Sequence, residues 1–194
     1  MNRLFKFFII ILILLLLGLF LGVLMSNVEK PKYKSLSIDN NIELRQYDVI
    51  YIAEVTIESE RKDAIKAGFK ILANYIFGGN SENLKIAMTA PVKQQRVENS
   101  WKISFLMPAE YSLKTLPNPN DKIVKIKKIT QKKYGVITFS GLNSDSNVDF
   151  HKNLLKKYLK KNNISTLNSA IYAFYNPPWT LPIFRRNEIM FEIL

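Results

Sequence analysis

An uncharged apolar run near the amino terminus constrains this chain more than any other feature of its sequence. Residues 7–25 read FFIIILILLLLGLFLGVLM. As an α-helix, a run of this length is about 28 Å long, close to the roughly 30 Å hydrocarbon core of a bilayer. We therefore expect residues 1–30 to form an N-terminal transmembrane anchor with its linker, and residues 31–194 to form one folded domain.

Two alternatives to an uncleaved anchor remain open. A cleaved signal peptide has a shorter apolar stretch followed by small residues, whereas this run ends Leu-Met-Ser at residues 24–26. A buried core helix is the second alternative, and the length of the run disfavours it. Basic residues flank the run on both sides, so the sequence predicts a single-pass membrane protein without assigning the side of the membrane.

The side-chain inventory excludes several kinds of chemistry. Because the chain has no cysteine, it can form no disulfide, thiolate metal site or covalent c-type haem attachment. The single histidine, His151, cannot by itself build a bis-histidine haem site or a His-rich zinc site. A serine nucleophile would also need His151, and Asp149 does not share its helical face. We assign no catalytic residue and no metal ligand, and expect a protein that is not an enzyme.

The formal net charge of +12 favours an anionic partner, and most of this charge lies in residues 31–194. A phospholipid surface, a nucleic acid and a small ligand with carboxylates all fit, as does a solvated lysine-rich face without a partner. The lysine pairs are scattered and accompany no nucleic-acid-binding motif. We therefore expect no nucleic-acid binding.

The periodicity of the apolar residues predicts the same order of elements twice. The first half has a strand at 49–57, a helix at 61–77 and extended stretches at 84–95 and 101–107. The second half has a strand at 134–141, a helix at 146–161, and strands at 170–175 and 187–194.

A further strand at 123–129 is expected to pair with the one after it through a short turn at 130–133. The fold class is therefore α+β. We expect a distorted antiparallel β-barrel made of two βαββ repeats with two packed helices, preceded by one N-terminal transmembrane helix.

The helix at 61–77 has two apolar rows where one would suffice. Its core stripe contains Gly68 and Leu72, flanked by Ile65 and Ile76. A second apolar row, Phe69, Ala73 and Phe77, runs along another face and is flanked by Lys66 and Lys70. This second row is either part of a wide core face or an apolar wall of a ligand groove with a basic rim.

Four motifs follow one another in order from about residue 33 to the end. They are IELRQY at 42–47, the Gly-Gly-Asn turn at 78–80, KIAMTAPV at 85–92, and NPPW at 176–179 with RRNE at 185–188. Together they resemble the SOUL haem-binding family, whose corresponding segments read Y-E-I-R-x-Y, K-I-x-M-T-x-P-V, Y-D-P-P and R-R-N-E-V. The resemblance implies the same two-helix distorted barrel that the order of elements predicts.

The resemblance also implies a ligand. Members of the family are associated with haem and other tetrapyrroles, bound non-covalently along the first helix. The motif register carries that surface onto Lys66, Phe69, Ala73 and Asn74, with Trp179 as a lid. Because porphyrin is an apolar disc with two carboxylates, Lys70 and Phe77 join this candidate site. The expected function is carriage or buffering of haem by a membrane-tethered domain.

Departures from the family pattern leave the iron ligand unassigned. Gln46 stands where some members carry a histidine, and a glutamine is a poor iron ligand. His151 is expected to pack against the core, and Met88 and Met107 to fill it. Arg185 and Arg186 fit either a propionate or an ion pair with Glu188. The alternative function is an effector-binding module for another amphipathic small molecule or a protein partner, without haem.

Overall fold

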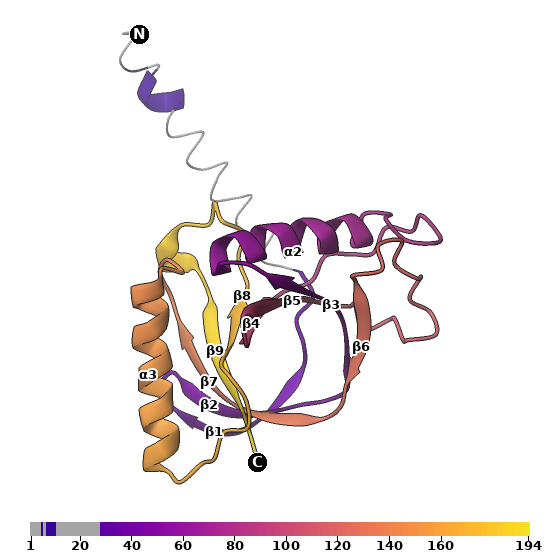
Figure 1. The fold of residues 1–194 in the computed structure, drawn as a ribbon. Helices are drawn as coiled ribbons and strands as arrows, with labels where there is room; N and C mark the ends of the chain where they lie inside the picture. Colours follow the sequence, from indigo (N-terminus) through magenta and orange to yellow (C-terminus); the bar gives the residue numbers. More distant parts are fainter. Residues whose placement is uncertain (1–4, 6, 11–27) are drawn as a thin grey trace.

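The computed structural model describes residues 5, 7–10 and 28–194 of the chain. The domain is α+β, with nine strands in one antiparallel sheet (Figure 1). The first half contains β1 (Tyr33–Asp39), β2 (Ile42–Tyr47), β3 (Ile50–Glu58), α2 (Arg61–Ile76), β4 (Val92–Val97) and β5 (Ser100–Leu106). The second half contains β6 (Lys125–Ile129), β7 (Lys132–Phe139), α3 (Asp145–Lys161), β8 (Ile171–Phe174), the 3₁₀ turn η1 (Pro182–Phe184) and β9 (Asn187–Ile193).

The two βαββ repeats are confirmed by the strand order β1-β2-β7-β9-β8-β4-β5-β3-β6. In the first repeat β5 lies between β3 and β4, and in the second β9 lies between β7 and β8. The repeats join where β4 pairs with β8. The strand that precedes each repeat pairs with the other repeat. β2 precedes the first repeat and pairs with β7 of the second, and β6 precedes the second repeat and pairs with β3 of the first.

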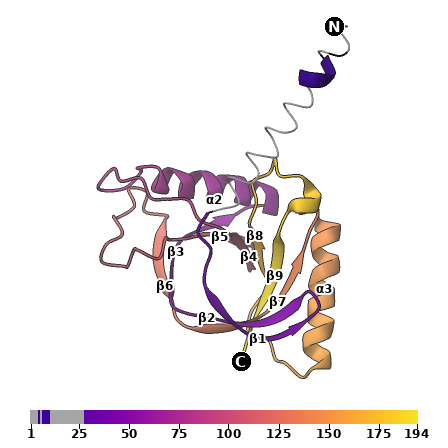
Figure 2. The same ribbon diagram turned by 180° about the vertical axis from the view of Figure 1, so that it is seen from behind.

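The predicted hairpin between the strands now labelled β6 and β7 is wrong. These strands do not pair with each other; Thr130 and Gln131 instead connect them along one extended path. Pairing runs from Ile50–Ile129 to Tyr47–Lys132 without a change of register. The linking residues contain no glycine or asparagine of the kind that a two-residue hairpin needs. As a result the sheet curls strongly, which is visible from both sides in Figures 1 and 2.

Both helices pack on the outer face of the curled sheet. α2 covers β3 and β5, and α3 covers β7 and β9. α2 lies close to β5 at Gly68, where an added Cβ would lie 2.9 Å from Ile103 Cγ1 and Cδ1. Successive residues of a strand point to opposite faces of the sheet. One set therefore packs beneath a helix, and the other set points to the inner face, inside the curl.

The elements differ from the sequence-based expectation at several places. Neither β1 nor β2 was among the predicted elements, and all residues of β1 are exposed. The expected extended stretch 84–95 forms a regular strand only from Val92 onward. The expected linker contacts the domain at Glu29, whose carbonyl accepts a hydrogen bond of 2.9 Å from the Ala90 amide.

No helix among the described residues is both long and apolar enough to cross a membrane. Most of the apolar run 7–25 lies outside the described residues, so the predicted anchor stays a prediction.

Candidate functional site

One face of α2 carries six of the seven predicted site residues, which we call the α2 shelf. Its members are Lys66, Phe69, Lys70, Ala73, Asn74 and Phe77, the last lying at the C-cap of the helix. Phe69 is 40% exposed and Phe77 is 59% exposed, and the three polar side chains are exposed. The core is formed instead by Ala64, Gly68, Leu72, Tyr75 and Ile76. The second apolar row is therefore accessible to solvent rather than sealed under the helix.

Phe69 is held in place although its ring is accessible. Its ring packs against the buried Phe105 of β5, with the centroids 5.3 Å apart and the planes at 66°. This edge-to-face contact fixes one side of the ring and leaves the rest uncovered. No residue of the α2 shelf lines the cavity around Lys93, the cavity beside Met107 or the cavity beside Trp101. The shelf is thus an open surface on which a flat apolar molecule could lie.

The seventh predicted residue, Trp179, lies on the β8–β9 loop (residues 175–186) and is 60% exposed. Arg185 stabilises this loop by donating hydrogen bonds to the carbonyls of Pro178 and Thr180. Other large apolar side chains of the loop, among them Ile183 and Phe184, are also exposed. The structure shows no contact between Trp179 and α2, so its role as a lid stays a prediction.

Arg186 belongs to a buried ion cluster around Glu188. The Glu188 carboxylate is 0% exposed and lies 3.0 Å from Arg45 Nη1 and 2.6 Å from Arg186 Nη2. Tyr175 donates a hydrogen bond of 2.8 Å to it. Burial alone would raise the pKa of Glu188, but the two guanidinium groups and these hydrogen bonds hold it below its ordinary value. The sequence left open whether Arg186 binds a propionate or pairs with Glu188, and the structure shows the ion pair with Glu188.

The candidate iron ligands pack as structural residues. The His151 ring stacks on Phe139 at a centroid distance of 4.1 Å, and its Nδ1 donates to the Asn147 carbonyl at 2.8 Å. Met88 and Met107 pack in the core cluster beneath α2. Among the described residues no group of three or more His, Asp or Glu side chains could hold a metal ion. The expectation that these residues serve packing is confirmed, and the axial ligand stays unassigned.

The motif residues hold the loops around α2. The Asn80 side chain donates to the carbonyls of Tyr75 and Leu84 and accepts from the amides of Glu82 and Leu84. In the 85–92 segment, Ile86 is buried and the Thr89 hydroxyl donates to the Leu106 carbonyl at 2.7 Å. These contacts fix the end of α2 and the chain after it, and so position the α2 shelf.

A charged cavity on the inner face of the sheet was not predicted. It has a volume of about 510 Å³ and includes Lys93 of β4, Lys102 of β5, Lys127 of β6 and Lys132 of β7. The signal in the sequence was the alternation of Glu54 and Lys102 with apolar residues on the strands now labelled β3 and β5. Without the strand pairing, such residues cannot be told from a solvent-exposed face.

The fold is similar to that of several solved structures at low sequence identity. The C-terminal domain of EcmrR superposes with a TM-score of 0.62 at 12% identity, covering 84% of this chain and 98% of that one. EcmrR in a complex with DNA gives 0.60 at 11% identity, covering 78% and 56%. A hydrolase from Listeria innocua gives 0.55 at 7%, covering 82% and 94%. At these identities the likeness concerns the fold alone.

The comparison with curated proteins finds no match to this chain. A family model does match, under the description SOUL heme-binding protein, over residues 28–192. The match includes α2, the 85–92 segment and the β8–β9 loop, whose arrangement is described above. The chain therefore belongs to the SOUL haem-binding protein family.

Proposed function

We propose that this protein binds haem or another tetrapyrrole on the α2 shelf and carries or buffers it without catalysis, while tethered to a membrane. The observation that carries the proposal is the pairing of two accessible phenyl rings, Phe69 and Phe77, with the exposed Lys66 and Lys70 on one helix face. Membership of a haem-binding family supports the ligand class.

The residues of the α2 shelf fit the periphery of a porphyrin. An apolar disc gains from contact with the rings of Phe69 and Phe77, and the small Ala73 between them allows close approach to the helix. The ammonium groups of Lys66 and Lys70 can pair with the two propionates. Asn74 adds a neutral hydrogen-bonding group at the same edge. These side chains bind and orient the ring, while iron, when present, supplies the redox and optical properties of haem.

Recognition on this surface depends on the ring rather than on the iron. The single histidine is on α3, where its Nδ1 bonds to a backbone carbonyl and its ring stacks on Phe139. The α2 shelf itself contains no histidine, methionine or carboxylate. We therefore expect metal-free protoporphyrin to bind about as tightly as haem.

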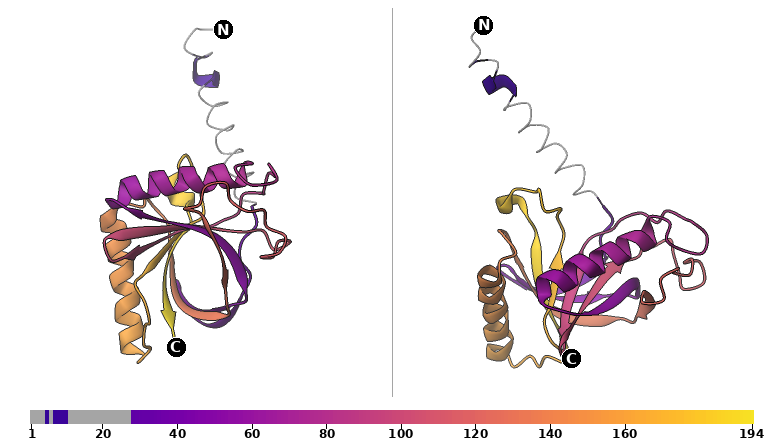
Figure 3. Two further views of the ribbon diagram at one scale, coloured as in Figure 1. Left: turned by 45° about the vertical axis from the view of Figure 1, so that its right-hand side comes forward. Right: turned by 45° about the horizontal axis from the view of Figure 1, so that its top comes forward.

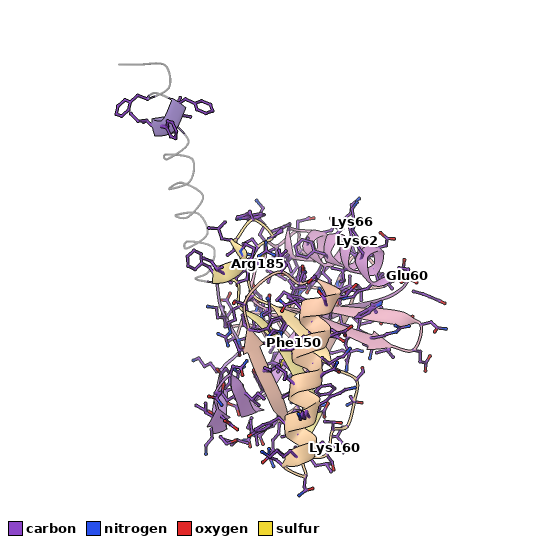
Figure 4. All side chains as sticks on the ribbon, turned by 90° about the vertical axis from the view of Figure 1, so that its left-hand side faces the viewer. Glu60, Lys62, Lys66, Phe150, Lys160 and Arg185 are labelled. Carbon is purple, nitrogen blue, oxygen red and sulfur yellow. The ribbon has the colours of Figure 1, made fainter. Side chains whose placement is uncertain are left out.

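Two features support the tether to a membrane. Val28 packs against the core cluster that contains Tyr175, at the base of the β8–β9 loop. Since Val28 follows Met25 by three residues, it lies at most about 11 Å along the chain from the apolar run. Figures 3 and 4 show α2, with Lys62 and Lys66, at the same end of the molecule as the β8–β9 loop, with Arg185. An anchor at 7–25 would hold the α2 shelf beside the bilayer, where apolar pigments partition.

The experiment is an absorption titration of the full chain, in nonionic micelles, with haem and with protoporphyrin. We expect a saturable Soret shift that Phe69→Asp or Phe77→Asp weakens about tenfold or more, because an apolar contact is lost and an anion faces the propionates. Phe150→Asp is the matched control, since Phe150 is exposed like Phe77 but lies on α3.

Absence of a saturable shift, or equal weakening by the Phe150 variant, would contradict the α2 shelf as the binding surface. The tether has a separate readout: membranes that carry the full chain are washed with alkaline carbonate, and release of the chain into the wash argues against an anchor.

A further inference from the structure

One part of the inner face of the curled sheet is a core cluster that contains Val136, Ala173 and Met190, and another part lines a charged cavity. This cavity of about 510 Å³ is lined by residues from seven strands, β3 to β9. On β3 the inward residues are Ile50, Ile52 and Glu54, while Tyr51, Ala53 and Val55 pack under α2. On β5 the inward residues are Lys102 and Ser104. A closed core would not place lysines and glutamates at these positions, because unpaired buried charges are costly.

Two of the lysines in the cavity are neutralised by carboxylates of neighbouring strands. Lys127 Nζ lies 2.6 Å from Glu54 Oε1, and Lys132 Nζ lies 2.6 Å from Glu192 Oε1. These pairs cross from β6 to β3 and from β7 to β9. They account for the charge on one side of the cavity.

Two other lysines keep a net positive charge on the opposite side. Within residues 28–194, neither Lys93 nor Lys102 has a carboxylate within ion-pair distance. The β4–β5 register pairs Lys93 with Ser104 and Gln95 with Lys102, so these four side chains share the inner face and Lys93 is a diagonal neighbour of Lys102. Lysine side chains and a hydroxyl group at this spacing can donate to one anionic head group.

Lys93 is the more enclosed of the two. Its Nζ lies 5.7 Å from the centroid of the Tyr47 ring, deep in the curl. Burial lowers the pKa of Lys93 to about 8, and the negative charge of Glu188 opposes that effect. The other ionisable groups of the cavity are Glu54, Arg96, Glu98, Lys102, Lys127, Lys132, Tyr134 and Glu192. An anion beside Lys93 would replace the solvation that this ammonium group has lost.

The remaining lining is apolar. Ile52, Ile129 and Ile171 border the same cavity, together with the Tyr134 ring. The volume is within the usual range for pockets that enclose a small organic ligand. A guest that satisfies both parts of the lining has an anionic head and an apolar body.

We propose that this cavity is a second binding site, specific for a small amphipathic carboxylate. The carboxylate pairs with Lys93 and Lys102, and the apolar body packs against Ile52, Ile129 and Ile171. The sheet separates this site from the α2 shelf, since α2 packs on the outer face of β3 and β5. The inference is therefore independent of the proposed haem function.

Titration calorimetry of the full chain in nonionic micelles tests the site with three probes: 1-naphthoate, acetate and 1-naphthalenemethanol. We expect 1-naphthoate to bind at least about tenfold more tightly than either the small anion or the neutral alcohol, because only 1-naphthoate engages both parts of the lining. Heats measured at pH 8 in buffers of different ionisation enthalpy should show proton uptake, because the bound anion raises the pKa of Lys93.

The variant Lys93→Met,Lys102→Met should weaken 1-naphthoate about tenfold or more and abolish the proton uptake, while its haem titration stays unchanged. The matched control Lys62→Met,Lys66→Met removes two exposed lysines of α2 and should leave 1-naphthoate binding unchanged. Circular dichroism establishes that each variant is folded.

Three results would overturn the proposal. They are no binding of 1-naphthoate, unchanged binding in the folded cavity variant, and a larger loss in the α2 control than in the cavity variant. Loss of haem binding in the cavity variant would show instead that the two sites are one.

Discussion

The outer and inner faces of the curled sheet are built from the same strands but have opposite chemistry. Under α2, residues of β3 and β5 such as Ala53, Val55 and Ile103 are fully buried. One position along, Glu54 and Lys102 point into the inner cavity. The outer face is a core that supports an open apolar shelf, whereas the inner face combines a buried core cluster with a charged cavity. One set of strands can thus hold two binding surfaces with different ligand requirements, since alternate residues act independently.

The largest expected effect concerns the buried ion cluster at the base of the inner face. Glu188→Gln leaves Arg45 and Arg186 without their shared carboxylate, so we expect the free energy of unfolding to fall by about 3–5 kcal/mol. Denaturant unfolding at neutral pH measures this loss.

Glu54→Gln is the control, since it removes a carboxylate that pairs with the more exposed Lys127. It should lower the free energy of unfolding by about 1 kcal/mol or less. Equal losses would show that the inner face is uniformly solvated.

The outer face should respond to volume instead of charge. Gly68→Val places new atoms against the buried Ile103, which has to move, so we expect a loss of about 2 kcal/mol in unfolding free energy. Because the helix must lift from β5, porphyrin binding on the α2 shelf should weaken while 1-naphthoate binding is retained. Ala67→Val, on the exposed side of the same helix, is the control. A parallel loss of both ligands would mean that the two faces are not independent.

The smallest effect is a pH dependence specific to the inner face. The pKa of Lys93 is lowered to about 8 in the folded protein, below the ordinary lysine value of 10.5, so the unfolded chain binds more protons between these values. Stability contributed by this group therefore rises with pH across that window. Urea midpoints measured at pH 7.5 and about pH 10 should rise more in the parent than in Lys93→Met. Identical slopes would place the Lys93 ammonium in solvent.

The two faces also differ in how far sequence patterns can predict them. The 3.6-residue period of 61–77 identified two apolar rows on α2, but it left open whether the second row was buried or accessible. Alternation in 101–107 likewise predicted a strand with Trp101, Ile103 and Phe105 on one buried face. Lys102 gave no comparable signal, because a lysine opposite an apolar face is the ordinary pattern of a half-exposed strand, and Lys93 lies in a strand that shows no apolar alternation.

By itself the sequence determined the periodic elements, the repeated βαββ order, the absence of thiol chemistry and, through its motifs, the family. These properties depend on residues that are close together along the chain. Only the tertiary structure decided that β6 pairs with β3, that Arg186 forms an ion pair with Glu188, and that the lysines of β4 to β7 share one cavity. Those facts depend on pairing between distant segments, which local periodicity does not encode.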